Sequence, residues 1–266
     1  MIFLKLGGSL ITHKDTPETA REEVVRRLAE EIRRALGERP DLRLLIGHGS
    51  GSFGHSAAAR FGTHRGAETP AEWAGFSEVW AVANRLHRLV VDELRRAGLL
   101  AMGFPPSASA VCEDGALIAL SVEPIERALR EGLIPVVAGD VAFDRVRGTT
   151  ILSTERVFGY LAPRLQPERL LLAGIEAGVF ADYPAKTRVM ATLTRQDLGA
   201  VQVGAAAAPD VTGGMGDKVR QALELVAALP QMEALIFSAE EPGLLQAALL
   251  GQSPGTRLLA SPRPPA

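Results

Sequence analysis

The sequence predicts an α/β protein of three layers, with a mostly parallel central sheet covered by helices on both faces. Two observations carry this prediction. Short apolar runs typical of buried strands alternate with segments of helical periodicity along the 266 residues. The first two strand-like runs also end in glycine-rich turns. With 47% hydrophobic residues, the chain can form one large domain, or two lobes packed as one unit.

Periodicity and capping signals place the elements in order. Residues 18–36 are expected to form a helix, because apolar residues recur there at helical spacing and Gly37 follows. Thr69, Pro70 and Glu72 form a capping box with proline at the first helical position. The strands are expected at residues 1–6, 42–46, 99–104, 133–138, 170–173 and 234–238. The helices are expected at residues 18–36, 56–61, 69–96, 122–130, 154–165, 214–229 and 242–249.

Composition excludes several classes of function. A net charge of −2 and a pI near 6.2 give no basic surface for nucleic acid. The single cysteine, Cys112, excludes an internal disulfide and a multi-cysteine metal site, and the histidines lack zinc-site spacing. We expect no dedicated metal site. No signal segment and no apolar run of about 18 residues is present, so we expect a cytoplasmic protein without a membrane span.

Three glycine-rich segments are candidates for binding phosphate. One covers residues 47–55 and directly follows the second expected strand, the pair Gly7-Gly8 follows the first, and residues 210–218 open a late helix. Glycines allow the backbone to bend so that its N–H groups point at an anion. Parallel sheets bind ligands at the carboxyl ends of their strands. Alternatively, each segment only connects a strand to a helix.

Cations accompany these segments. Lys5 lies in an apolar strand, where burial requires an anionic partner, although a lysine on an edge strand can also reach solvent. Lys218 lies in the first turn of the late helix, against the helix dipole. Lys14 is either an ordinary loop lysine or part of the same charge cluster. With His55, these cations suit phosphoryl transfer, although no Walker A pattern is present.

The motifs resemble those of the amino acid kinase superfamily. The matching segments are residues 5–9, residues 49–55, Gly139-Asp140 and residues 210–218. The Ser-Phe-Gly-His motif that ends at His55 is similar to that of the isopentenyl phosphate kinases. The resemblance implies an amino acid kinase-like fold. It also implies transfer of a phosphoryl group from ATP, with Mg²⁺, to isopentenyl phosphate, which gives isopentenyl diphosphate by direct in-line transfer.

The resemblance also implies roles for individual residues. Lys5 would lie between the donor and acceptor phosphates, and Lys14 would stabilise the group in transfer. Ser50 and His55 would bind the substrate phosphate. The nucleotide would contact Gly7, Gly8, Ser9, Gly51, Gly214 and Lys218, and Lys218 would also be catalytic.

Two stretches depart from the family pattern. Relatives carry Ser-Gly-Asp-Asp where this chain has residues 153–156. Glu155 is expected to replace the acid that orients the catalytic lysines, and Thr154 replaces a glycine next to the substrate phosphate. At residues 174–178 both acids of a Thr-Asp-Val-Asp-Gly stretch are missing, and Glu176 is one position out of register. Nucleotide affinity or base preference can therefore differ.

An apolar substrate tail needs an apolar pocket. Trp73, Phe76 and Trp80 recur along one face of the long helix, and we expect Phe76 and Trp80 to bind substrate. Val141 and Phe143 are further candidates for the wall. The alternative is that these side chains belong to the core or to a dimer interface.

The domain organisation follows from the same resemblance. We expect one domain at residues 1–260, with an acceptor-binding lobe at about 1–165, a nucleotide-binding lobe at about 166–260 and a flexible tail at 261–266. A homodimer is expected. Rival hypotheses are a kinase for another small phosphate or phosphonate such as fosfomycin, and a non-catalytic nucleotide sensor of the same fold.

Overall fold

The structure is a computed structural model that describes residues 1–199 and 214–260, except for the side chains of residues 55, 56, 59, 198 and 199. The expected tail at 261–266 and residues 210–213 of the third glycine-rich segment lie outside the described residues. The helices are α1 (Gly8–Ile11), α2 (Glu22–Glu38), α3 (Gly51–Phe61), α4 (Pro70–Arg96), α5 (Glu123–Arg130), α6 (Thr154–Leu165), α7 (Gly214–Ala228) and α8 (Leu244–Leu249), with 3-10 helices at Thr63–Arg65, Pro106–Ala108 and Arg195–Gly199. The strands are β1 (Ile2–Leu6), β2 (Leu44–His48), β3 (Ala101–Gly103), β4 (Val111–Glu113), β5 (Ala116–Ala119), β6 (Ile134–Ala138), β7 (Asp140–Asp144), β8 (Gly148–Leu152), β9 (Arg169–Gly174), β10 (Thr192–Leu193), β11 (Glu233–Ser238) and β12 (Gly255–Leu258).

The central sheet has eight strands within the described residues, in the order β10-β12-β11-β9-β1-β2-β6-β3. Every neighbouring pair is parallel except β11 and β12. Strand β1 is central and pairs with β2 and β9, so that Lys5 lies beside Gly47 and Leu172. This confirms the expected α/β fold with a mostly parallel sheet.

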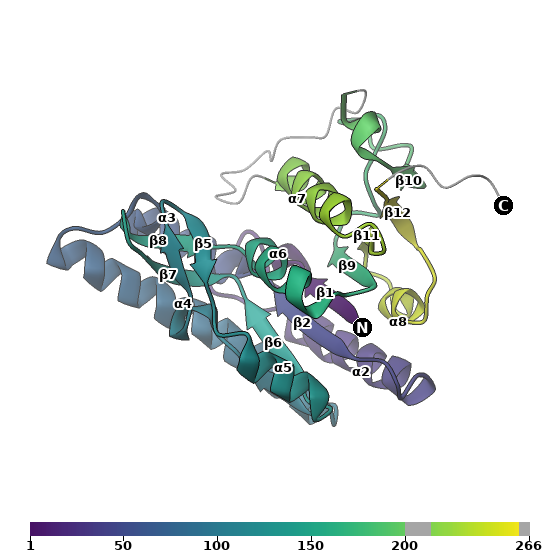
Figure 1. Cartoon of the computed structure of the whole chain (residues 1–266), viewed down its shortest axis with the longest axis horizontal. Coiled ribbons are helices and arrows are strands. Elements are labelled where there is room, and N and C mark those ends of the chain that lie inside the picture. The colour runs from purple at the N-terminus through teal and green to yellow at the C-terminus, as the bar shows by residue number, and fades with distance from the viewer. Residues whose placement is uncertain (200–213, 261–266) are drawn as a thin grey trace.

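The two faces of the sheet pack against different helices. Ile2, Leu4 and Leu6 belong to the core that includes apolar residues of α2, α4 and α8. Phe3 belongs to the other core, with α5, α6 and α7, and its ring lies 5.0 Å from that of Phe158 on α6. Successive side chains of a strand point to opposite faces. Lys5 therefore points to the same face of the sheet as Phe3, the face that packs against α6. Figure 1 shows α6 over β1.

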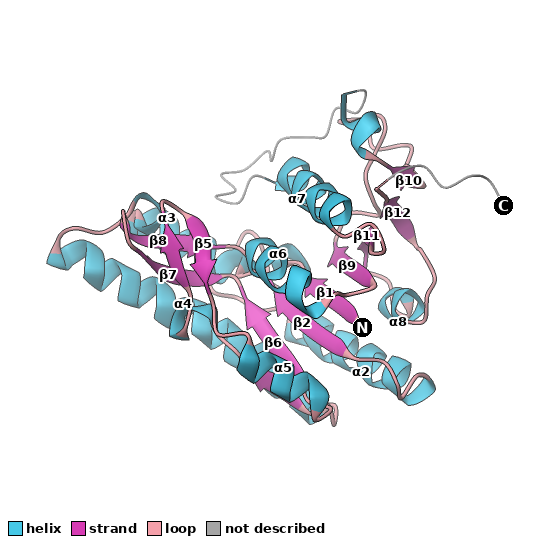
Figure 2. Ribbon diagram, viewed as in Figure 1, coloured by secondary structure: helices cyan, strands magenta, loops and turns pink. Residues whose placement is uncertain are grey.

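A second sheet was missed by the sequence analysis. Its strands run in the order β5-β4-β7-β8, and β7 packs against the N-terminal part of α4 (Figure 2). A single residue, Gly139, separates the end of β6 from the start of β7. The strands are only 3 to 5 residues long, which leaves little room for a recognisable alternation.

Most predicted helices and strands begin and end within a few residues of their observed bounds, and one helix does not. Thr69 caps α4 in a capping box, and Ser153 caps α6, so both helices begin where the sequence placed them. The helix expected at 56–61 instead begins at Gly51. The segment 47–55 is therefore only in small part a turn: Gly47 and His48 end β2, and residue 55 lies inside α3. No helix among the described residues is long and apolar enough to span a membrane.

Candidate active site

The carboxyl ends of four central strands bring three glycines together. Gly7 N–H donates to the Ala173 carbonyl at 2.8 Å, and Gly49 N–H donates to the Leu6 carbonyl at 3.0 Å. Gly139 N–H donates to the carbonyl of His48 at 3.0 Å. These bonds extend the parallel pairing of β9, β1, β2 and β6 by one residue. The turns that follow these strands consequently meet at one edge of the sheet.

The first two glycine turns pack backbone against backbone. A Cβ on Gly8 would lie 2.6 Å from the backbone N of Gly51, and one on Gly49 would lie 2.8 Å from the backbone N of Gly8. Gly51 also has a φ of +50°, which other residues rarely adopt. Both α1 and α3 begin at this junction, and the first N–H groups of a helix have no partner inside it. The junction suits phosphate binding.

Lys5 and Glu155 form a buried ion pair at this edge. Nζ of Lys5 donates a hydrogen bond to Oε1 of Glu155, and the two side chains are only 8% and 11% exposed. Glu155 is the second residue of α6, and Phe158 lies one turn further along the helix. The strand alternation that places Phe3 against Phe158 thus directs Lys5 toward Glu155.

Lys218 adds a second positive charge near Glu155. Burial raises the pKa of Glu155, but the charge of Lys5, the hydrogen bond from Lys5 and the charge of Lys218 outweigh it, so the pKa lies below its usual value. The carboxyl group is therefore ionised at neutral pH. The structure brings together three of the expected catalytic residues, from β1, α6 and α7.

The other expected nucleotide and catalytic residues are placed as follows. Gly214 opens α7 with a φ of +67°, and Lys218 is the fifth residue of that helix, just beyond the first turn. Ser9 lies in α1. Lys14 is exposed on the loop between α1 and α2.

Ser50 and Thr154 differ in what they offer a substrate. Ser50 is half-buried at the N-terminus of α3, and its side chain caps no backbone group of that helix. Thr154 is 1% exposed, and its hydroxyl donates to the carbonyl of His48 at 2.6 Å. Only the backbone of Thr154 is left for a phosphate. Residue 55 occupies α3, but the side chain of His55 lies outside the described part.

The aromatic residues form a cluster that differs from the expected stripe. The ring of Phe143 lies 5.1 Å from that of Phe76 and 6.1 Å from that of Trp73, and Trp73 and Phe76 are 5.6 Å apart. Phe143 is 51% exposed, whereas Phe76 is buried. Trp80 is 45% exposed and has no ring contact with this cluster. The cluster joins α4 to β7 of the second sheet.

A buried histidine pair beneath the site was not found from the sequence. Nε2 of His48 lies 3.0 Å from Nδ1 of His87, and Nδ1 of His48 lies 3.1 Å from the carbonyl of Gly49. Burial, the neighbouring histidine and the charge of Lys5 lower the pKa of His48 to about 3, and burial lowers that of His87 to about 4. Both rings are neutral at pH 7. The helical position of His87, facing the core with Leu86 and Val90, was the available signal.

Glu176 lies in the stretch 174–178, the second of the two stretches that depart from the family pattern. Glu176 accepts a hydrogen bond from Nζ of Lys186 at 2.7 Å, so its carboxylate is already paired within the expected nucleotide edge.

Among residues 1–199 and 214–260, no three His, Cys, Asp or Glu side chains are grouped so that they could hold a metal ion.

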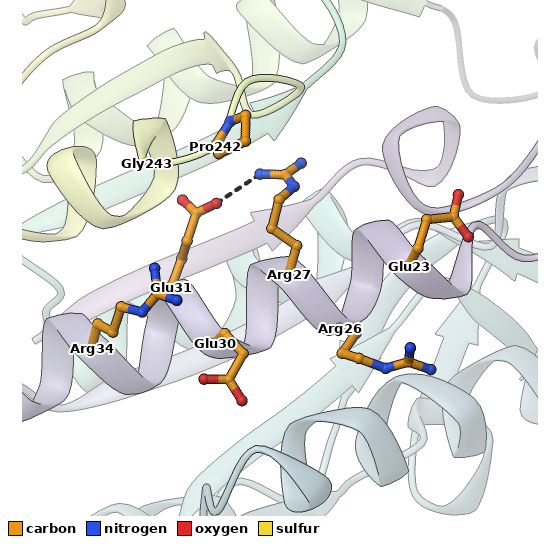
Figure 3. Close-up of a pocket in the computed structure, with 8 residues that line it drawn as sticks. All are labelled: Glu23, Arg26, Arg27, Glu30, Glu31, Arg34, Pro242 and Gly243. Atoms are coloured by element: carbon orange, nitrogen blue, oxygen red, sulfur yellow. Dashed lines mark hydrogen bonds and ion pairs between the residues drawn. The ribbon is translucent and has the colours of Figure 1, made fainter.

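A groove between α2 and the start of α8 lies apart from this site (Figure 3). Its volume is about 380 Å³. Arg27 pairs with Glu31 at 2.7 Å and donates to the Ala239 carbonyl at 2.7 Å. Glu31 also accepts the N–H groups of Leu245 and Gln246. The groove therefore serves to attach α8 to α2, and its charges neutralise each other.

The sequence profile of the amino acid kinase family matches residues 1–238. The chain belongs to this family.

Within the family, the chain is similar to isopentenyl phosphate kinases. That of Methanothermobacter thermautotrophicus is 34% identical, over 97% of this chain and 98% of the relative. That of Haloferax volcanii is 34% identical, over 96% and 97%. Among solved structures, one described as X-ray structures of isopentenyl phosphate kinase has a TM-score of 0.81 and 31% identity, over 97% of this chain and 99% of the other. The T. acidophilum isopentenyl phosphate kinase product complex, 23% identical over 97% and 99%, has a TM-score of 0.77 and shares the fold.

Proposed function

We propose that this chain is an ATP-dependent kinase that converts isopentenyl phosphate to isopentenyl diphosphate. The observation that carries the proposal is the buried Lys5–Glu155 ion pair beside the two glycine turns that pack backbone against backbone. Lys218 is close enough to lower the pKa of Glu155. The identity to isopentenyl phosphate kinases over almost the whole chain supports this acceptor.

The chemistry requires charge stabilisation more than proton transfer. An oxygen of the acceptor phosphate attacks the γ-phosphorus of ATP, the bond from that phosphorus to the bridging oxygen breaks, and ADP leaves. The acceptor oxygen is already anionic, so no general base is needed. Positive charge aimed at the phosphates lowers the barrier.

The residues at the sheet edge have these roles in the transfer. Lys5, held by Glu155, lies between the donor and acceptor phosphates, while Lys218 and the backbone around Gly214 bind the nucleotide phosphates. Gly7, Gly8, Ser9 and Gly51 contact the ATP phosphates through their backbones. Lys14 approaches the group in transfer from its exposed loop.

The acceptor is held at both ends. Ser50 and His55 bind its phosphate, with the backbone of Thr154 beside them. We propose that the cluster of Trp73, Phe76 and Phe143 receives the apolar tail, which the half-exposed ring of Phe143 supports. Replacing His55 by alanine is expected to raise the KM for isopentenyl phosphate, and His55→Gln to retain part of the affinity through a neutral donor.

Magnesium is expected to arrive with ATP. The donors among the described residues do not fit a protein cage for this ion, because no three acidic or histidine side chains are grouped. Mg²⁺ prefers to keep several waters and bind phosphate oxygens. Its chemistry when bound is to neutralise charge on the ATP phosphates.

The assembly and location belong to the same proposal. Leu100 and Met102 are 59% and 49% exposed at the edge strand β3, which supports a homodimer formed through this edge. Light scattering tests it by measuring the molar mass against 28.2 kDa for one chain. Because ATP is the donor, we place the enzyme in the cytoplasm.

The experiment that tests the function compares two acceptors. Purified protein is given Mg-ATP with isopentenyl phosphate or with fosfomycin, and ³¹P NMR identifies the product. We expect the paired signals of a diphosphate from isopentenyl phosphate, with a kcat/KM far above that for fosfomycin. A preference for fosfomycin would overturn the acceptor, and ATP binding without product from either would favour the sensor.

A further inference from the structure

Thr12 connects the two glycine turns through its side chain. It follows α1 directly in extended backbone, with φ −136° and ψ 153°, and is 1% exposed. Its hydroxyl donates to the carbonyl of Gly8 at 2.8 Å and accepts the N–H of Ser52 at 3.0 Å. A threonine hydroxyl has one proton and two lone pairs, so both bonds can exist together.

The Thr12 hydroxyl packs directly against Gly51. A Cβ on Gly51 would lie 2.1 Å from Oγ1 of Thr12 and 2.8 Å from the carbonyl oxygen of Gly8. The hydroxyl thus occupies the space that a side chain at position 51 would need. The glycine at 51 and the threonine at 12 are a matched pair.

The same residue begins the loop that carries Lys14. Thr12 forms an isolated antiparallel bridge with Ala20, and His13 N–H donates to the Thr19 carbonyl at 3.0 Å. These contacts close the loop at its base, two residues before Lys14. Thr12 therefore contacts the turn after β1 and the start of α3, and it starts the Lys14 loop.

We propose that Thr12 is a positioning residue whose hydroxyl sets the separation of the two glycine turns, and with it the alignment of donor and acceptor phosphates. The inference rests on the proposed function, which assigns the turn after β1 to ATP. The turn after β2 carries Ser50, assigned to the acceptor phosphate, next to Gly51, assigned to ATP. In-line transfer is sensitive to such alignment, since a displacement of about 1 Å can lower the rate by roughly 100-fold. The residue itself need not touch either substrate.

The test compares Thr12→Val, which keeps the shape and loses the hydroxyl, with Thr12→Ser, which keeps the hydroxyl. We expect T12V to lower kcat by roughly 10- to 100-fold, with the KM of each substrate changed by less than about threefold. T12S is expected to stay within about threefold of the unmodified protein. If T12V is not recovered folded, T12C takes its place, because a thiol is a weaker hydrogen-bonding group than a hydroxyl and should fall below T12S.

A matched control tests whether the loss of a buried threonine hydroxyl elsewhere in the protein lowers kcat as Thr12→Val does. Thr256 is fully buried, donates to the Met190 carbonyl at 2.6 Å and accepts the N–H of Val179 at 2.8 Å. Thr256→Val removes the same two kinds of bond away from the glycine turns. We expect it to lower the Tm without lowering kcat at saturating substrate. Equal kcat losses in T12V and T256V, or in T12V and T12S, would overturn the proposal.

Amide exchange separates this proposal from the proposed function. The Ser52 N–H is expected to exchange faster in T12V than in T12S or the unmodified protein, measured by NMR without substrate. Unchanged exchange would refute the positioning role even if the protein is an active kinase. Lack of kinase activity in the unmodified protein would refute the proposed function, while the exchange data would still report the Thr12 bond.

Discussion

Lys5 and Glu155 are 150 positions apart in the sequence and form a buried ion pair at the carboxyl edge of the central sheet. The pair depends on two local rules. Strand alternation directs Lys5 to the face shared with Phe3, and the cap at Ser153 starts α6 so that Glu155 lies in its first turn. The helix N-terminus also favours a carboxylate there.

The first prediction concerns this carboxylate. Glu155→Gln removes the charge that holds Lys5, so kcat should fall by about 100-fold, comparable to the loss of one transition-state donor. Glu155→Asp keeps the negative charge on a side chain one methylene shorter, which is the acid that relatives carry. Its kcat should stay within about tenfold of that of the unmodified protein. Steady-state ADP release measures both. Equal activity of the Gln and Asp variants would show that the charge of residue 155 is unimportant.

The second prediction concerns Lys218. Its charge helps to lower the pKa of Glu155, so Lys218→Gln should raise that pKa. A ¹³C NMR titration of the Glu155 carboxyl group measures the shift, with Glu155→Gln used to assign the signal. Lys186→Gln removes a lysine that pairs with Glu176 instead and serves as the control. If K218Q leaves the pKa of Glu155 unchanged, the two residues are not neighbours as described.

The third prediction distinguishes the aromatic cluster from the sequence-based stripe. Phe143→Ala should raise the KM for isopentenyl phosphate by roughly tenfold, since a lost aromatic contact is worth about 1 kcal/mol or more, with the KM for ATP unchanged. Trp80→Ala should change it by less than about twofold, because Trp80 is outside the cluster. If Trp80→Ala has the larger effect, the sequence-based expectation is right and the structural one wrong.

The fourth prediction concerns the pH dependence of stability. The pKa values of His48 and His87, about 3 and about 4, lie below the unfolded value near 6.5, so the unfolded chain binds more protons between pH 6.5 and 4.5. The free energy of unfolding should therefore fall as pH falls through this window, by up to about 1.4 kcal/mol per pH unit for each histidine.

Urea unfolding at several pH values measures this slope. His87→Gln keeps a side-chain donor near His48 and removes one titrating group, so its slope should be shallower by about one histidine. A stability that is flat from pH 6.5 to 4.5 in the unmodified protein would show that the two rings are not buried as a neutral pair.

Local signals predicted much of this fold. The capping box at Thr69 places the start of α4 correctly, because caps act within a single turn. Lys5, Glu155 and Lys218 were expected together, and the structure brings them together. The roles of these three residues, like those of Lys14, Ser50 and His55, remain predictions.

The parts that sequence reasoning missed depend on tertiary contacts. The predicted start of α3 was too late because two glycines among its first four residues argue against a helix, whereas the packing of Gly51 on Gly8 fixes the helix start there. Phe143 and Trp73 meet only because the second sheet folds back over α4, and short strands gave no signal for that sheet. Periodicity alone therefore grouped Trp80 with Trp73 and Phe76, whereas the ring contacts join those two residues to Phe143.

The most direct test of the central claim is ADP release by the purified protein with Mg-ATP and isopentenyl phosphate. We predict release that depends on isopentenyl phosphate and is nearly lost in Glu155→Gln, which would show that Glu155 serves as the acid that holds Lys5. Measurable ATP binding without release, or release that is equally fast in Glu155→Gln, would contradict the account.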